Sequence, residues 1–326
     1  MIDISVNCMG LKLKSPFIAA SSGLTTQPDK VAAFAKAGAG AIVVKLLFEE
    51  QITNEAEFLD SLSQDYTEAA DYLHYYTRQN ALDKYLQLIK ELKKLVEIPV
   101  IASINCYNTG EWTAFSKEIE AAGADGIELN IYSLPLDTKK SSESIEKEYL
   151  VAVKAVCGSV KIPVAVKIGD SFTNIPGFVS SLKAYGAKAV TMFNRFYRPD
   201  IDIKTLKIIP ADAFSQPEEH IQGLRWVAIT TSLVKNIDIV SNTGIHNGSD
   251  AIKHLLAGAS AVQMCSALYK NGPEAIAEAV GDLHLFMDKQ GFKNIEDFKG
   301  RLNYESISNP GKFERVQFIK NYSSKK

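Results

Sequence analysis

An internal repeat most constrains how this chain folds. Four segments share one pattern, in which a glycine closes a helical stretch and a short apolar run follows within about four residues. A glycine at this position ends the helix in the left-handed conformation, and the apolar run becomes a buried strand. The segments are AGAGAIVV (37–44), AGADGIEL (122–129), YGAKAVTM (185–192) and AGASAVQM (257–264).

Apolar runs between the repeats complete a set of eight predicted strands. Three of these runs begin alike, as EIPVIAS, KIPVAVK and NIDIVSN. Helical spacing separates each strand from the next, which predicts an α/β fold, a (β/α)8 TIM barrel, in preference to a doubly wound sheet with the same turns. The predicted strands are Phe17–Ala20, Ala41–Lys45, Val100–Asn105, Gly126–Ile131, Val164–Ile168, Ala189–Asn194, Asp238–Ser241 and Ala261–Met264.

Segments outside this alternation have predicted roles of their own. Residues 2–16 alternate apolar and polar around Cys8-Met9-Gly10, which predicts an N-terminal β-hairpin that closes the bottom of the barrel. Residues 46–80 and 195–222 are long connections, and residues 292–322 form a C-terminal extension. Because no linker interrupts the chain, we expect residues 1–326 to form a single domain. The predicted helices are Asp29–Ala37, Leu82–Val96, Trp112–Ala122, Ser144–Cys157, Phe178–Tyr185, Leu224–Lys235, Ala251–Leu256 and Pro273–Met287.

Composition argues against several classes of protein. A net charge of −2 favours neither nucleic acid nor an anionic membrane as a partner, and 46% hydrophobic residues with 23% charged residues are typical of a soluble globular chain. No apolar run is long enough to span a membrane and the N-terminus lacks the pattern of a signal peptide, so we expect a cytoplasmic protein. The 4 cysteines are scattered without a CxxC pair, so we expect reduced thiols and no structural metal.

Two strand ends predict a phosphate site. Thr243 and Gly244 follow the seventh predicted strand, and Cys265 and Ser266 follow the eighth. Loops of small residues expose their backbone amides, which can hydrogen-bond an anion. In (β/α)8 barrels this pair of loops frequently binds phosphate, so we expect a phosphorylated ligand here.

Two lysines and three asparagines occupy strand positions near the same mouth of the barrel. Lys45 ends the second strand and Lys167 lies near the end of the fifth, while the asparagines are Asn105, Asn130 and Asn194. A lysine in a buried strand is costly unless it is paired, so these lysines suggest a bound group that is anionic or rich in acceptors. A phosphorylated flavin fits, because a cation near its pyrimidine edge stabilises the reduced form.

Other interpretations of these residues stay open at this point. Lys45 or Lys167 could be the Schiff-base lysine of a non-redox lyase or aldolase barrel, and the asparagines could merely satisfy strand ends. The tyrosine-rich segment 66–76 could be a loop packed on its own aromatic rings or a lid over a substrate. A binding protein without catalysis would share the phosphate loops.

Over nearly its whole length the chain resembles the dihydroorotate dehydrogenase family. Members of this family are FMN-containing (β/α)8 barrels that oxidise dihydroorotate to orotate in pyrimidine biosynthesis, so the resemblance implies that fold, cofactor and activity. The segments that carry it are SPFIAASSG (15–23), AIVVK (41–45), GIELNI (126–131), VAVKI (164–168), SNTGI (241–245), GSDAIKHLLAGASAVQMCSAL (248–268) and GFKNIEDFKGRL (291–302).

The resemblance also implies roles for individual residues. After the fourth strand the family has a Cys or Ser base, and Ser133 falls at that position in NIYSLP (130–135), although the second Asn of the family motif is absent. The implied substrate-binding residues are Lys45, Asn130 and Asn194. The cofactor-binding set, with Asn105 added from its strand-end position, is Ala20, Ser22, Gly23, Lys45, Asn105, Asn130, Lys167, Gly223, Thr243, Gly244, Cys265 and Ser266.

The resemblance extends to a branch of the family. The chain starts directly at the hairpin, without the apolar N-terminal helix of membrane-bound members, and so resembles the soluble branch. Members of that branch are homodimers that use fumarate, or pair with an iron–sulfur subunit to use NAD, so the resemblance implies a homodimer and allows an electron-transfer partner. Nothing between Phe48 and Asn80 matches the segment that clasps the pyrimidine in the family, which leaves an FMN-dependent oxidoreductase of a different substrate as the alternative.

Overall fold

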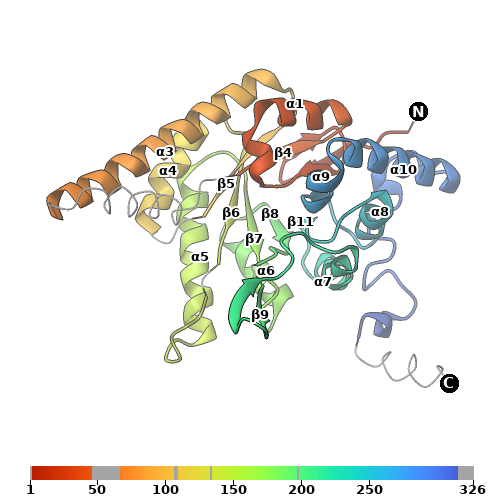
Figure 1. Cartoon of the computed structure of the whole chain (residues 1–326). Helices are drawn as coiled ribbons and strands as arrows, with labels where there is room; N and C mark the ends of the chain where they lie inside the picture. The colour runs from red at the N-terminus through yellow and green to blue at the C-terminus, as the bar shows by residue number, and fades with distance from the viewer. Residues whose placement is uncertain (1, 46–66, 106–108, 133, 197, 315–326) are drawn as a thin grey trace.

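Eight parallel strands close into a barrel with helices around it (Figure 1). The computed structural model describes residues 2–45, 67–105, 109–132, 134–196 and 198–314. The order around the barrel is β11-β12-β3-β4-β5-β6-β7-β8, and pairing of β8 with β11 closes it, so the predicted (β/α)8 fold is confirmed. The strands are β3 (Phe17–Ala19), β4 (Ala41–Val44), β5 (Val100–Ile104), β6 (Gly126–Asn130), β7 (Val164–Ile168), β8 (Ala189–Met192), β11 (Asp238–Ser241) and β12 (Ala261–Met264).

The strands form where the sequence has continuous apolar runs. Every residue of β4, β5, β7, β8 and β12 is buried, because helices cover the outer face of the barrel and side chains fill its interior. The repeat glycines Gly38, Gly123, Gly186 and Gly258 all have φ between 95° and 109°. Residues with a β-carbon rarely adopt this conformation, so the repeat sets the helix-to-strand turns as predicted.

The helices follow the predicted alternation, with one large difference. Helix α3 begins at Thr67, so the prediction that residues 67–80 belong to a connection is wrong. Residues 67–81 contain no glycine or proline and many good helix formers, which the cluster of tyrosines obscures. The helices are α1 (Pro28–Ala37), α3 (Thr67–Leu95), α4 (Thr109–Ala121), α5 (Ser142–Ser159), α6 (Ile175–Ala184), α7 (His220–Leu233), α8 (Gly248–Leu256), α9 (Ser266–Asn271) and α10 (Glu274–Gln290).

The N-terminal hairpin closes the bottom of the barrel, as predicted. Its strands β1 (Val6–Cys8) and β2 (Leu11–Leu13) pair antiparallel around Met9 and Gly10, both with positive φ. The Met9 amide donates to Asp238 Oδ2 at 2.7 Å, at the start of β11. A β-carbon on Gly126, at the start of β6, would lie 2.8 Å from the Met9 methyl group. The hairpin therefore packs against the N-terminal ends of the barrel strands.

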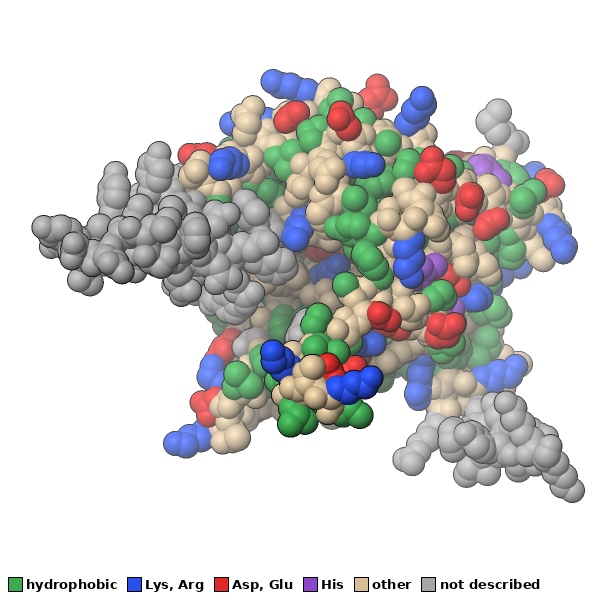
Figure 2. All heavy atoms as spheres, viewed as in Figure 1, with side chains coloured by type: hydrophobic (Ala, Val, Ile, Leu, Met, Phe, Trp, Pro, Cys, Tyr) green, Lys and Arg blue, Asp and Glu red, His purple; other side chains and the backbone are tan. Residues whose placement is uncertain are grey.

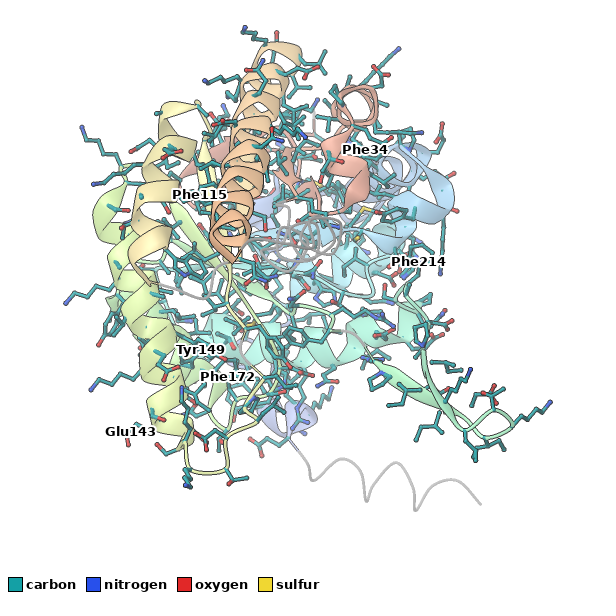
Figure 3. All side chains as sticks on the ribbon, turned by 60° about the vertical axis from the view of Figure 1, so that its left-hand side comes forward. Phe34, Phe115, Glu143, Tyr149, Phe172 and Phe214 are labelled. Atoms are coloured by element: carbon teal, nitrogen blue, oxygen red, sulfur yellow. The ribbon has the colours of Figure 1, made fainter. Side chains whose placement is uncertain are left out.

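A second hairpin stands where the sequence predicts only a long connection. Strands β9 (Pro199–Asp202) and β10 (Lys207–Pro210) pair antiparallel within residues 195–222. Figure 3 shows this hairpin projecting away from the barrel. The prolines at its two ends and the charged residues along it conceal the strand pattern in the sequence.

The described part of the C-terminal extension packs back on the barrel helices. It contains two short 3-10 helices, η3 (Ile295–Asp297) and η4 (Pro310–Phe313). The amides of Gly300 and Leu302 donate to the carbonyls of Leu255 and Leu256 at the end of α8, at 3.0 and 2.8 Å. Within the ranges that the structure describes, no helix has both the length and the apolar character needed to cross a membrane.

Candidate functional site

A cavity opens at the C-terminal ends of the barrel strands. It encloses about 620 Å³ of space not filled by protein atoms, part of it open to solvent. Seven of the residues that line it belong to the predicted site. They are Ala20, Lys167, Asn194, Thr243, Gly244, Cys265 and Ser266; the others are Ser21, Arg195, Ala213, Ser215, Asn242, Ile245 and Gln263.

The loop after β11 has the backbone geometry of an anion site. Thr243 and Gly244 both have positive φ, of 73° and 76°, and both line the cavity. A β-carbon on Gly244 would lie 2.3 Å from the backbone nitrogen of His220, so only glycine fits there. Thr243 donates from Oγ1 to the carbonyl of Phe193 at 2.8 Å. This hydrogen bond offsets part of the strain of a β-branched residue at positive φ.

Ser215, which the sequence does not single out, joins the loops that follow β11 and β12. We call these two loops, with Thr243 and Gly244 in one and Cys265 and Ser266 in the other, the phosphate-type loops. Ser215 is 4% exposed, and its amide and hydroxyl both donate to the Ser266 hydroxyl, at 2.9 and 3.0 Å. The Ser215 hydroxyl also lies 3.1 Å from Nε2 of His246. Burial lowers the pKa of His246, and the charge of Lys270 lowers it further. The hydroxyls of Ser215 and Ser266 and the imidazole of His246 thus join the backbone amides as hydrogen-bonding groups on the side of the cavity that we expect to hold phosphate.

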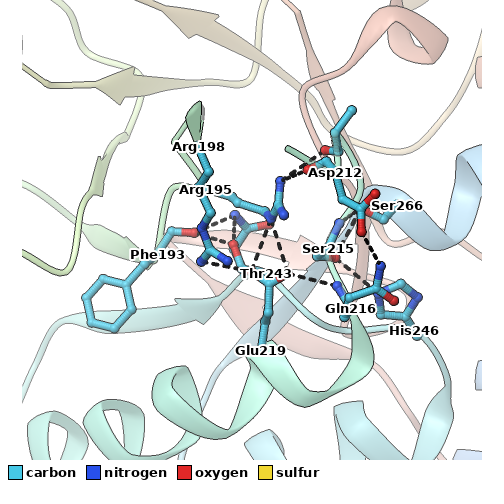
Figure 4. A network of polar contacts seen from close by, with 12 residues as sticks. Phe193, Arg195, Arg198, Asp212, Ser215, Gln216, Glu219, Thr243, His246 and Ser266 are labelled. Carbon is cyan, nitrogen blue, oxygen red and sulfur yellow. Dashed lines mark hydrogen bonds and ion pairs between the residues drawn. The ribbon is translucent and has the colours of Figure 1, made fainter. Parts of the chain in front are cut away.

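Arg195 fixes the segment that carries Ser215, which we call the mouth loop (residues 211–219). Its guanidinium donates to Glu219 at 3.1 Å and to the carbonyls of Asp212 and Ala213 at 2.9 and 3.1 Å (Figure 4). Arg198 pairs with the same carboxylate at 3.0 Å. Although burial raises the pKa of Glu219, the hydrogen bonds from Arg195 and Gln216 and the two arginine charges lower it below its usual range. An ionised Glu219 therefore holds the mouth loop over the cavity.

Lys167 on β7 lines the same cavity, and Lys45 follows β4 at the same end of the barrel. Lys167 is 7% exposed and donates from Nζ to Oε1 of Gln263 at 3.3 Å. Burial raises the pKa of the Cys265 thiol, while the charges of Lys167 and Lys45 oppose that rise. Both lysines are thus close enough to Cys265 for their charges to act on it. The backbone amide of Lys45 donates to Oγ1 of Thr25 at 3.3 Å.

Two of the predicted asparagines meet across the mouth of the barrel. Asn194 donates from Nδ2 to Oδ1 of Asn130 at 2.9 Å, with β7 and its Lys167 between their strands. Each amide keeps donors or acceptors for a further group. Asn105 follows β5 at the same end of the barrel and is half-buried.

Six members of the predicted cofactor set are not among the residues that line the cavity: Ser22, Gly23, Lys45, Asn105, Asn130 and Gly223. The Ser22 hydroxyl is buried with no hydrogen-bond partner among the described residues, and the Gly23 amide donates to the Tyr269 hydroxyl at 2.9 Å. Gly223 lies on α7, where a β-carbon would come within 3.7 Å of His254 and 3.8 Å of the Asn242 carbonyl. The close approach of α7 to the phosphate-type loop explains a small residue at this position.

A buried histidine pair underlies the phosphate-type loop. Nδ1 of His254 lies 2.7 Å from the Ser241 hydroxyl, and Nε2 of His220 lies 3.6 Å from Asp250. The two rings meet edge to face with centroids 5.5 Å apart. Burial lowers the pKa of His254 to about 3, with a further contribution from His220, so this ring is neutral in the folded protein.

Two predicted features fall outside the described residues. Ser133, the predicted base, is one of them, and so are Tyr66 and the side chains of the other tyrosines of segment 66–76. The neighbour of Ser133 is described: Tyr132 stacks on Phe196 with ring centroids 3.8 Å apart. This stack brings the loop after β6 against the loop after β8.

Some lining residues carry a signal in the sequence and others do not. Gln263 is a polar residue in the apolar run AVQM, which is unusual enough in a buried strand to have marked it. Asn242 belongs to the strand-end segment SNTG. Ser215 reaches the cavity only because the second hairpin returns the chain to the barrel, so no local pattern reveals it. Arg195 directly follows the Asn194 strand end, and this position marks it in the sequence.

The residues present fit a phosphorylated flavin. The hydroxyls of Ser215 and Ser266 suit its phosphate, and the buried Lys167 that lines the same cavity suits an acceptor-rich ring edge. Among the residues that the structure describes, no group of three or more His, Cys, Asp or Glu side chains could hold a metal ion.

Sequence comparison places the chain among known proteins. The profile of the family described as dihydroorotate dehydrogenase matches residues 3–287. The chain belongs to the dihydroorotate dehydrogenase family. As a member of this family it is a flavin-dependent oxidoreductase of pyrimidine biosynthesis, as its resemblance to the family in the sequence analysis implies.

Individual relatives cover from two thirds to more than nine tenths of the chain. One is the catalytic subunit of dihydroorotate dehydrogenase B (NAD(+)) of Thermoplasma volcanium, 29% identical over 92% of this chain and 98% of its own. Another is a putative dihydroorotate dehydrogenase A (fumarate) of Aeropyrum pernix, 26% identical over 91% of this chain and 97% of its own. The B-type catalytic subunit of Methanothermobacter thermautotrophicus is 31% identical over 66% of this chain and 73% of its own.

Proposed function

We propose that this chain binds FMN at the C-terminal mouth of the barrel and uses it to oxidise dihydroorotate to orotate. The observation that carries the proposal is a single cavity that joins two phosphate-type loops to a buried lysine and a strand-end asparagine. Bound flavin would accept the two electrons that the substrate gives up.

The shape of the phosphate side supports FMN as the particular flavin. The turn at Thr243 and Gly244, together with Ser215 and Ser266, offers donors for one phosphate group. The sequence has no GxGxxG fingerprint for the paired phosphates of a dinucleotide. Protein that purifies yellow and releases FMN on denaturation is the expected result. Colourless protein that cannot be reconstituted with FMN would exclude this cofactor.

Residues of the chain itself would stabilise the reduced flavin, bind the substrate and transfer a proton. Lys167 and Lys45 would supply positive charge where reduced flavin carries negative charge. Asn130 and Asn194 would hold the substrate through the amide groups that their mutual hydrogen bond leaves free. Ser133 would take a proton from the substrate carbon, which requires a neighbour or a water to relay that proton onward.

Binding of orotate tests the substrate directly. Orotate should perturb the flavin absorption of wild-type protein, and Asn194→Ala should weaken orotate binding about tenfold or more while FMN stays bound, because a hydrogen bond to an anion is worth about 1.5–3 kcal/mol. Asn303→Ala, in the C-terminal extension, is the matched control and should bind orotate as the wild type does. Flavin-containing wild-type protein that ignores orotate would favour an FMN barrel acting on another substrate.

Lys167 is buried beside the cavity, so Schiff-base chemistry on a lysine is the alternative mechanism that an experiment should exclude. A lyase or aldolase would form a Schiff base on Lys45 or Lys167 with a carbonyl substrate. Reduction with borohydride in the presence of such a substrate would then attach it covalently to lysine. The flavin mechanism predicts no such adduct.

We also propose that the second hairpin joins two copies of the chain into a homodimer. Ile201 and Ile208 face each other across the hairpin, and both are exposed, at 65% and 74%. Ile203 and Leu206 extend this apolar patch, and Figure 2 shows hydrophobic side chains gathered there. Ile208→Lys should shift the sedimentation of the protein toward a monomer, whereas Leu285→Lys, an equally exposed site on α10, should not.

The remaining proposals concern the electron acceptor, the domain and the cell compartment. Relatives named for fumarate and for NAD(+) both match the chain, so reduced enzyme should pass electrons to fumarate, or to NAD through an electron-transfer partner. Packing of the extension on α8 supports a single domain over residues 1–326. Free thiols at Cys8, Cys157 and Cys265 support a reducing, cytoplasmic location.

A further inference from the structure

A buried carboxylate lies beneath Lys167 inside the barrel. Glu128 on β6 is 1% exposed. Its Oε2 accepts hydrogen bonds from the Thr191 hydroxyl at 2.9 Å and from Nε2 of Gln263. Its Oε1 has no hydrogen-bond partner and lies 3.9 Å from Nζ of Lys167, which is an ion pair but too long for a hydrogen bond.

Gln263 bridges these two charged groups. Its amide donates to Glu128 on one side and accepts from Lys167 at 3.3 Å on the other. The orientation of the amide is fixed by chemistry, since a carboxylate only accepts and an ammonium group only donates. An ammonium group has three donors, so this contact leaves two of them for a group in the cavity that Lys167 and Gln263 line.

We propose that Gln263 is a positioning residue that keeps Lys167 from closing onto Glu128. Without the amide, the unpartnered oxygen of Glu128, 3.9 Å away, is free to accept a hydrogen bond from Lys167, and a direct ion pair in a buried site is strong. Lys167 would then move away from the cavity with its charge neutralised. The inference rests on the proposed flavin site, where that charge stabilises the reduced cofactor.

The test is the reduction potential of the bound flavin. Gln263→Met keeps the side-chain volume and leaves both charges in place, so only the amide group between Lys167 and Glu128 is lost. We call this amide group the spacer. We expect reduced flavin to lose about tenfold in affinity relative to oxidised flavin, which is a fall of about 30 mV for a two-electron couple. Thr191→Val removes a hydrogen bond from the same carboxylate but keeps the spacer, and it should leave the potential unchanged.

A second substitution tests the mechanism. Adding Glu128→Gln to Gln263→Met removes the acceptor that draws Lys167 away, so the potential should return to the wild-type value or exceed it. If the methionine variant does not fold, Gln263→Asn serves instead, because its shorter amide cannot reach both partners.

Each result decides one point. Wild-type protein without flavin would refute the proposed function itself. Flavin-containing protein whose potential is unchanged by Gln263→Met would refute the spacer. A fall that Glu128→Gln does not reverse would mean that Gln263 acts on the flavin directly, and it would refute the spacer as well.

Discussion

Acid should destabilise the protein through His254, the buried ring beneath the phosphate-type loop. Burial lowers the pKa of His254 to about 3, against about 6.5 for an unfolded histidine. Between these values the unfolded state binds more protons, so stability falls as the pH falls from 6.5. The slope is about 1.4 kcal/mol per pH unit. Between pH 7.5 and pH 5.0 the loss is about 2 kcal/mol from this ring alone.

A substitution separates His254 from the other histidines. The pKa values of His220 and His246 are also lowered, mainly by burial, so the wild type should lose more than the share of His254. His254→Asn keeps a polar atom near Ser241 but cannot titrate. We expect this variant to be less stable than the wild type at pH 7.5, because the smaller side chain leaves a cavity. Between pH 7.5 and pH 5.0 its unfolding free energy should fall by about 2 kcal/mol less than that of the wild type.

Urea unfolding at the two pH values measures both quantities. Ser241→Ala is the matched control: it removes the hydroxyl 2.7 Å from the ring but keeps the titrating group in its buried site. Its stability should fall at both pH values, and its pH dependence should stay that of the wild type. The reasoning is refuted if His254→Asn loses as much stability on acidification as the wild type does.

Three further changes test the site. Thr243→Val keeps a β-branched residue at positive φ but loses the bond to Phe193, so it should cost about 1 kcal/mol of unfolding free energy, whereas Thr243→Gly loses the bond and the strain together and should stay near wild type. The pKa of Glu219 is lowered, so the stability that it gives the mouth loop is present above about pH 4.3 and disappears as the pH falls through its folded pKa. Amide hydrogen exchange of residues 211–219 should therefore rise in the wild type when the pH falls through that value. In Glu219→Gln it should be raised already at neutral pH. Ser133→Ala should leave FMN bound and slow flavin reduction by about 100-fold, and reduction at the wild-type rate in stopped flow would place the base elsewhere.

The barrel was predictable because its signals are local. A glycine that ends a helix and an apolar run that follows it occupy a few adjacent residues, and the repeat states this four times. Helix α3 was mispredicted over residues 67–80 because a run of tyrosines suggests a loop, although its composition permits a helix. The hairpin of β9 and β10 was missed because its strands face solvent, and because prolines at its two ends and charged residues along it conceal the strand pattern.

The site was predictable only where strand ends supply it. Lys167, Asn194, Gly244 and Ser266 follow from their places in the barrel, since parallel strands deliver their ends to one mouth. Ser215 reaches Ser266 across 51 residues through a fold of the mouth loop that no spacing encodes. The contacts of Gln263 depend on side chains from three different strands, so only the assembled barrel reveals its role.

Anaerobic mixing of the purified protein with dihydroorotate shows whether this substrate reduces the flavin. We expect a yellow protein whose absorption at about 450 nm bleaches on mixing, as the flavin takes electrons from the substrate. Orotate should appear in an amount equal to the flavin reduced. A flavin that dithionite bleaches but dihydroorotate does not would contradict the proposed substrate, and a protein that binds no flavin would contradict the account as a whole.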